Sequence, residues 1–122
     1  MNEPTTVTID SRSSGLKLIR INGDLDSMGT QMVEEPLNNA ITDRTSRVLV
    51  DLANVSFISS AGMAMLLVKG KMLRRGGGNM YLTSATERVK EVLSLAGFNE
   101  LFSVYATLDE ALATLETAAP SA

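Results

Sequence analysis

The chain has 122 residues, enough for one domain with a single hydrophobic core, and a net charge of −3 at pH 7. It contains neither cysteine nor histidine, which excludes disulfides, the usual zinc sites and every mechanism that pairs a nucleophile with histidine. The acidic balance argues against a nucleic-acid partner, because phosphate backbones bind basic surfaces. We therefore expect a protein that is not an enzyme and holds no metal or cofactor.

The sequence shows no pattern of export or membrane insertion. Residues 1–6 contain no basic region followed by an apolar run, so no signal peptide is predicted. The longest apolar segment, residues 63–68, is too short to span a bilayer. We expect a cytoplasmic protein that does not contact membranes.

The chain begins with a predicted β-hairpin. Residues 6–10 alternate polar and apolar side chains, and residues 16–21 form a second strand after a turn at residues 13–15. The segment Gly-Asp-Leu-Asp, residues 23–26, ends the hairpin.

A helix is predicted next, because Asp26 or Ser27 can cap it and apolar residues then recur at helical spacing. These residues are Met28, Met32, Val33, Leu37, Ala40 and Ile41. Pro36 either kinks this helix or marks the first turn of a second helical segment.

The middle of the chain predicts a buried strand, a long helix and another strand. Residues 47–52 include a continuous Val-Leu-Val run, which is typical of a central strand covered on both faces. The helix extends from Ser60 to about Arg75 and ends at three glycines, residues 76–78, because glycine accepts the left-handed backbone of a C-cap. Residues 79–83 predict the next strand.

Two capping boxes, residues 84–87 and 107–110, each predict the start of a further helix. The first of these helices ends at Gly97, and a short strand is expected within residues 101–105. The second helix should bury one apolar side, which consists of Leu108, Ala111, Leu112 and Leu115.

Strands and helices therefore alternate along the chain, a pattern typical of an α/β fold. We predict one domain over residues 5–116, with a mixed, mostly parallel sheet of four to five strands and about four helices. Residues 117–122 are small and polar, and we expect them to form a flexible tail.

Two serines, Ser59 and Ser60, stand at the start of the long helix, directly after the buried strand. A hydroxyl there lies among unpaired backbone N–H groups, which can hold a phosphate. Serine is also among the best N-cap residues, so a capping role is the simpler interpretation. Two features favour a functional site: the serines follow the carboxyl end of a buried strand, and two are present where one would cap.

Four segments carry a family resemblance: Val48-Leu49-Val50-Asp51-Leu52, Val55-Ser56-Phe57-Ile58, Ser60-Ala61-Gly62-Met63 and Gly23-Asp24-Leu25-Asp26. Together they resemble the bacterial anti-sigma factor antagonists, which are single STAS domains. The resemblance extends from about Thr5 to about Glu116 and implies the STAS fold.

The resemblance also implies a phosphorylation site. In that family the loop before the helix has the sequence Asp-Ser-Ser/Thr-Gly, and the first serine is phosphorylated by a partner kinase. Aligned on Phe57 and Gly62, that serine corresponds to Ser60. Here Ser59 replaces the aspartate and Ala61 replaces the following hydroxyl residue, so Ser59 is a minor alternative acceptor.

The resemblance implies partners as well. The unphosphorylated chain is expected to bind an anti-sigma factor that is also a serine kinase of the histidine-kinase-type ATPase fold, and so to release its target. Phosphorylation of Ser60 would abolish this binding, and a PP2C-type phosphatase would restore it. The alternative is a STAS scaffold or sensor module without a phosphorylation cycle.

The surface expected to bind the partner includes residues from two loops and the long helix. Asp24 and Asp26 could line it, or could serve only as turn and cap residues. On the helix, one apolar side should face the sheet; it comprises Met63, Leu66, Leu67, Gly70 and Leu73. A second side carries Met65, Val68 and Met72, and is either an exposed binding stripe or covered by a neighbouring helix. The full set is Asp24, Asp26, Ser59, Ser60, Ala61, Gly62, Met63, Met65, Val68 and Met72.

Four cations gather toward the end of the same helix: Lys69, Lys71, Arg74 and Arg75. Favourable interaction with the negative end of the helix dipole explains them. Binding of an anionic ligand is the alternative interpretation.

Overall fold

A five-stranded sheet forms the centre of the computed structural model, which describes residues 4–117. The strands lie in the order β1-β2-β3-β4-β5, with β1 antiparallel to β2 and every other neighbouring pair parallel. Their bounds are β1 (Thr6–Ser11), β2 (Leu16–Asn22), β3 (Arg47–Asn54), β4 (Asn79–Thr83) and β5 (Ser103–Tyr105). The predicted mixed, mostly parallel sheet is confirmed.

Five helices connect or follow the strands: α1 (Ser27–Ala40), α2 (Ser60–Arg75), α3 (Glu87–Leu95), α4 (Phe98–Leu101) and α5 (Leu108–Thr117). The element that the sequence did not predict is α4, a single turn closed by the Phe102 N–H on the Phe98 carbonyl at 2.8 Å. Pro36 lies inside one continuous α1, so no second segment begins there. The predicted tail lies, beyond Thr117, outside the described residues. Within residues 4–117 no helix is long and apolar enough to cross a membrane.

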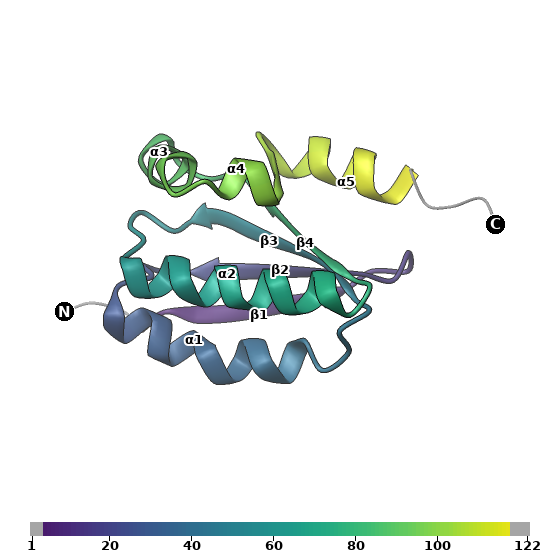
Figure 1. The fold of residues 1–122 in the computed structure, drawn as a ribbon, viewed down its shortest axis with the longest axis horizontal. Coiled ribbons are helices and arrows are strands. Elements are labelled where there is room, and N and C mark those ends of the chain that lie inside the picture. Colours follow the sequence, from purple (N-terminus) through teal and green to yellow (C-terminus); the bar gives the residue numbers. More distant parts are fainter. Residues whose placement is uncertain (1–3, 118–122) are drawn as a thin grey trace.

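Helices cover both faces of the sheet (Figure 1). On one face α1 and α2 pack over alternate residues of the central strands, including Ile19, Val48 and Val50, which are buried. The intervening residues Leu18 and Leu49 point to the opposite face and form a smaller cluster with α5, through Ala111 and Leu115. The inward-facing side of α5 agrees with the prediction.

The two capping-box predictions had different outcomes. Thr107 caps α5 as expected, with its Oγ1 accepting the Glu110 N–H at 3.1 Å. The prediction at residues 84–87 was wrong about the cap: α3 is capped by Thr86, whose Oγ1 accepts the Val89 N–H. Ser84 instead adopts a left-handed φ of 63° and donates its N–H to the Tyr105 carbonyl, because it follows the paired end of β4.

The parallel strands β2 and β3 place two connections side by side at the edge of the sheet that the carboxyl ends of the strands form. The loop after β2 and the loop after β3 both leave from carboxyl ends, and they are joined by a parallel bridge between Leu25 and Ile58. Leu25 donates its N–H to the Phe57 carbonyl at 2.9 Å and accepts the Ser59 N–H at 2.8 Å. The starts of α1 and α2 are therefore held together at this edge.

Candidate functional site

Ser59 is the N-cap of α2. Its backbone is extended, with φ −87° and ψ 172°, and its Oγ accepts the Gly62 N–H at 3.2 Å. The same hydroxyl donates to the Leu25 carbonyl at 2.8 Å. Ser59 therefore uses both its donor and its acceptor to hold the start of α2 against the neighbouring loop.

Ser60 is the first residue of α2, and its side chain is exposed. Its hydroxyl makes no hydrogen bond to any part of the chain that the structure describes. The capping role that competed with a functional role in the sequence belongs to Ser59 alone. Ser60 is left as a free hydroxyl beside the unpaired N–H groups and the positive dipole end of the helix.

The two aspartates of the preceding loop lie at the same edge of the sheet and are exposed. Asp26 caps α1, with its Oδ1 accepting the Gly29 N–H at 2.7 Å. Asp24 ties the two loops together, because its Oδ1 accepts the Ser56 N–H at 3.3 Å. Both aspartates thus have the turn and cap roles weighed from the sequence, and both keep carboxylate surface open to solvent.

Glycine stands at the third position of both helices that start at this edge. A Cβ on Gly29 would lie 2.0 Å from the Asp24 carbonyl oxygen, and a Cβ on Gly62 would lie 2.9 Å from the Leu25 carbonyl oxygen. Each glycine also donates the N–H that its helix cap accepts. Gly62 is buried, which leaves it little surface for a partner to contact. Its role is to let α2 approach the loop closely.

The sheet-facing side of α2 agrees with the prediction: Leu66, Gly70 and Leu73 are buried, and Met63 and Leu67 are half-buried. The opposite side is not the uniform methionine stripe that the sequence allowed. Met65 is only 6% exposed, whereas Val68 is 63% exposed and Met72 is half-buried. Of the two alternatives for this side of α2, Met65 follows the covered one and Val68 the exposed one.

The neighbouring helix α1 explains this burial. Lys69 follows Met65 by one turn and is itself buried, with its Nζ 2.9 Å from Glu34 Oε2 and hydrogen-bonded to Asn38 Oδ1. Both partners belong to α1, so the polar contact joins the two helices one turn beyond Met65. Lys69 thus has a structural role between the two helices.

Three exposed apolar side chains near this edge were not predicted: Met28, Met32 and Phe57, which are 70%, 43% and 43% exposed. Met28 and Met32 line a shallow hollow together with Asp24, Asp26 and Ser56. From the sequence, both methionines were only grouped with the apolar residues that recur at helical spacing in α1. Their angular offset from Val33 and Leu37 on a helical wheel, about 100° or more, could have separated them.

The described residues offer no metal site, since no three acidic side chains within residues 4–117 are grouped closely enough to hold an ion. The arrangement at this edge is a neutral hydroxyl at a helix start, two exposed carboxylates and a rim of exposed apolar side chains. Such a surface is suited to binding a protein, with one hydroxyl placed where a phosphate would be stabilised.

Comparison with known proteins agrees with this fold. The family model for the STAS domain matches residues 8–111. BtrV of Bordetella bronchiseptica, named as an anti-sigma factor antagonist, is 30% identical over 114 residues, which cover 93% of this chain and 97% of BtrV.

Solved structures show the same architecture. An anti-sigma factor antagonist from Mycobacterium paratuberculosis superposes with a TM-score of 0.80 at 22% identity, covering 91% of this chain and 93% of that one. SpoIIAA from Bacillus, in its phosphorylated form, superposes with a TM-score of 0.69 at 19% identity, covering 90% of this chain and 99% of that one. The chain described here belongs to the STAS domain family.

Proposed function

We propose that this protein is an anti-sigma factor antagonist controlled by phosphorylation of Ser60. In the unphosphorylated state it binds an anti-sigma factor that is also a serine kinase of the histidine-kinase-type ATPase fold, and so releases a sigma factor. The kinase phosphorylates Ser60 and a PP2C-type phosphatase removes the phosphate. The observation that carries this proposal is that the two serines at the start of α2 differ in their contacts. Ser59 caps the helix, whereas Ser60 keeps an exposed hydroxyl.

The switch follows from charge. A phosphate on Ser60 adds roughly −1.5 to −2 charges at a surface that already carries Asp24 and Asp26. The N–H groups and dipole at the start of α2 stabilise that charge within the domain itself. The fold therefore survives phosphorylation while the interface fails. A loss of about 3 kcal/mol at the interface weakens binding roughly a hundredfold.

Ser59 is a poorer acceptor than Ser60. Its hydroxyl donates to the Leu25 carbonyl and accepts the Gly62 N–H, so phosphorylation there removes the donated hydrogen and places an anionic group against the Leu25 carbonyl. Ser60 requires no such rearrangement. We assign the phosphorylation to Ser60, with Ser59 as a minor site.

The proposed contact surface is centred on the start of α2. It consists of exposed or half-buried residues from both loops and both helices: Asp24, Asp26, Met28, Phe57, Ser59, Ser60, Ala61, Met63, Val68 and Met72. Asp24 and Asp26 join it through the carboxylate surface left open by their structural hydrogen bonds.

Phosphorylation with the serine kinase of the same organism and ATP, followed by mass spectrometry, tests the proposal. We expect one phosphate on Ser60 in the parent protein and none in Ser60→Ala, with Ser59→Ala still modified. Modification confined to residues other than Ser59 and Ser60 would contradict it. No transfer, with no binding of the kinase, would indicate a STAS module without a phosphorylation cycle.

A further inference from the structure

One exposed stripe of α2 runs from the proposed phosphorylation site to the far end of the helix. Ser60, Ala64 and Val68 are spaced four residues apart and are exposed, as are Lys71 and Arg75 further along. At 100° per residue these five positions fall within about 80° of one another on the helix surface. A partner lying along α2 from Ser60 therefore meets Lys71 about 16 Å away and Arg75 about 22 Å away.

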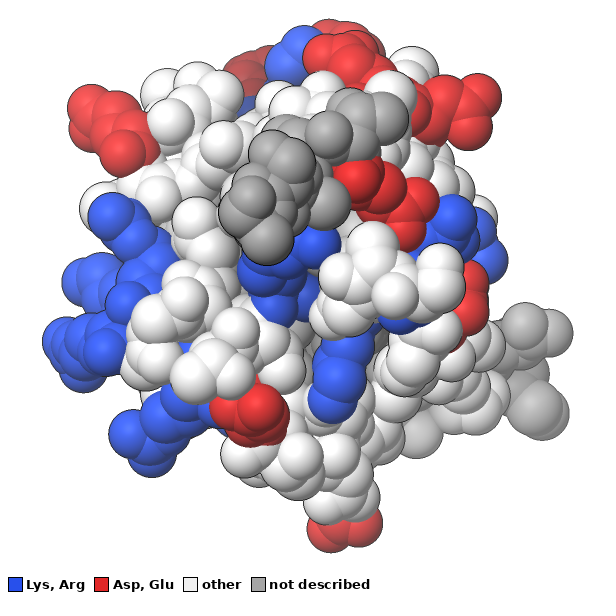
Figure 2. All heavy atoms as spheres, turned by 90° about the vertical axis from the view of Figure 1, so that its right-hand side faces the viewer, with Lys and Arg blue, Asp and Glu red and all other residues white. Residues whose placement is uncertain are grey.

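The glycine turn after α2 adds a third cation to the end of this stripe. A Cβ on Gly76 would lie 2.3 Å from Arg44 Cβ, and the Gly78 N–H donates to the Arg44 carbonyl at 3.1 Å. Arg44 is exposed and thus lies against the end of α2. In the view of this end of the molecule, Lys and Arg side chains gather on the side where α2 ends (Figure 2).

These three cations have no acidic partner among residues 4–117. The ion pairs of the described chain join other residues: Arg12 with Asp10 and Glu116, Arg20 with Asp51, and Lys69 with Glu34. The nearest carboxylate in sequence, Asp43, is turned into its own loop, where its Oδ1 accepts the Thr45 N–H at 2.9 Å. The positive charge of Arg44, Lys71 and Arg75 is therefore available to another molecule.

We propose that Arg44, Lys71 and Arg75 form a docking site for an acidic segment of the protein that binds at Ser60. This inference rests on the proposed function and names a second contact on the same partner. Charge complementarity identifies the segment as rich in Asp and Glu, and the intervening Ala64 and Val68 add an apolar contact between the two ends. A narrow stripe in a chain of net charge −3 fits an acidic peptide better than a nucleic acid or a lipid surface.

The kinetics of Ser60 phosphorylation test this docking site. Lys71→Glu/Arg75→Glu should raise KM for the protein about tenfold at low salt and leave kcat unchanged, because docking lies away from the transferred phosphate. High salt should reduce the difference, since exposed charges are screened. Lys71→Gln/Arg75→Gln should give a smaller increase in KM.

Arg88→Glu/Lys90→Glu is the matched control, because it reverses two exposed cations on α3 with the same change in net charge. We expect its KM to equal that of the parent. An unchanged KM in the Lys71/Arg75 variant, or an equal increase in the control, overturns the docking site. Circular dichroism and thermal melting establish that each variant is folded.

A binding measurement separates this inference from the proposed function. A capped ten-residue polyglutamate peptide should shift amide resonances at the end of α2 and near Arg44, and Lys71→Glu/Arg75→Glu should remove these shifts. Binding of phosphatidylglycerol vesicles or duplex DNA at this end, without peptide binding, overturns the inference. If no kinase phosphorylates Ser60, the proposed function fails, and the peptide titration still decides whether the site accepts acidic protein.

Discussion

The neighbouring hydroxyls of Ser59 and Ser60 differ in what they contact. We therefore expect Ser59 to contribute to stability and Ser60 to partner binding. Ser59→Ala should destabilise the domain by about 1 kcal/mol or more, because the helix loses its cap and the Leu25 carbonyl loses a donor. Ser60→Ala should stay within about 0.5 kcal/mol of the parent. Urea unfolding measures both, and a larger loss in Ser60→Ala would contradict the assignment.

The sequence predicted a serine cap at this helix but not which serine provides it. Both residues are good N-caps and they stand one position apart, so local preference cannot choose between them. The choice is made by a tertiary contact, the carbonyl of Leu25, which lies 34 residues away along the chain.

Gly62 tests how closely α2 approaches the neighbouring loop. Alanine is a better helix former than glycine by about 1 kcal/mol, so propensity alone predicts that Gly62→Ala stabilises the protein. The added Cβ would lie 2.9 Å from the Leu25 carbonyl oxygen and must displace the backbone. We expect a net loss of about 1–2 kcal/mol in unfolding free energy. A measured gain would show that the contact is not close.

At the scale of elements, α2 combines a structural side and an open side that the sequence could not separate. Met65 and Val68 both belong to one apolar stripe by spacing, yet one is covered by α1 and the other is exposed. On the same helix, Lys69 pairs with Glu34 of α1, two residues 35 positions apart. Periodicity shows that a helix has an apolar side but not which other helix packs on it.

Substitutions at these two positions should therefore have opposite consequences. Met65→Ala should cost about 2–5 kcal/mol of stability by leaving a cavity under α1. Val68→Glu should leave the unfolding free energy within about 0.5 kcal/mol of the parent and weaken partner binding at least tenfold, which is about 1.4 kcal/mol. Chemical denaturation and calorimetric titration measure the two effects. Normal partner affinity in Val68→Glu would remove this residue from the interface.

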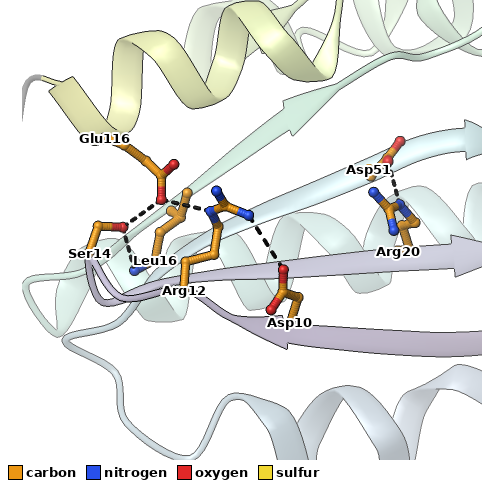
Figure 3. Close-up of polar contacts among 7 residues, drawn as sticks. All are labelled: Asp10, Arg12, Ser14, Leu16, Arg20, Asp51 and Glu116. Carbon is orange, nitrogen blue, oxygen red and sulfur yellow. Dashed lines mark hydrogen bonds and ion pairs between the residues drawn. The ribbon is translucent and has the colours of Figure 1, made fainter.

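The last helix, α5, is fastened to the hairpin tip by a polar cluster (Figure 3). Glu116 Oε2 accepts from Arg12 Nε at 2.7 Å and from Ser14 Oγ at 2.8 Å. These hydrogen bonds hold the pKa of Glu116 below its ordinary value of 4.5, and the bond from Arg12 has the larger effect. Because the folded state favours the ionised form, its contribution is complete above the ordinary pKa and is lost as pH falls through the lowered one.

Glu116→Gln should consequently be less stable than the parent at pH 7, and the difference should vanish in acid, where the parent carboxyl is protonated. Unfolding free energies measured across the acidic range give this comparison. Glu91→Gln on α3 is the control, because Glu91 is exposed and forms none of the ion pairs found in residues 4–117. A difference between parent and Glu116→Gln that persists at low pH would show that ionisation is not the cause.

At the scale of the whole molecule, the fold followed from the alternation of strands and helices, and its details depended on long-range contacts. The apolar run of residues 48–50 sufficed to predict β3, because a central strand is buried on both faces. The cap of α3 was misplaced because pairing with β5 holds Ser84 in a left-handed conformation. The exposed Phe57 was missed because exposure in a loop depends on how the elements meet.

Charge is also distributed unevenly between the two ends of α2. The exposed residues Asp24 and Asp26 lie at the edge that holds Ser60, and cations that form none of the ion pairs within residues 4–117 lie at the opposite end of α2. A partner that spans the helix would contact both ends. A phosphate added at the acidic end therefore acts where negative charge is already concentrated.

The affinity of the anti-sigma factor kinase for the unphosphorylated and the Ser60-phosphorylated protein tests the central claim most directly. We predict tight binding of the unphosphorylated form and a loss of about a hundredfold on phosphorylation, roughly 3 kcal/mol, with unchanged circular dichroism and melting temperature. Equal affinity of the two forms, or a loss accompanied by unfolding of the domain, would contradict the account.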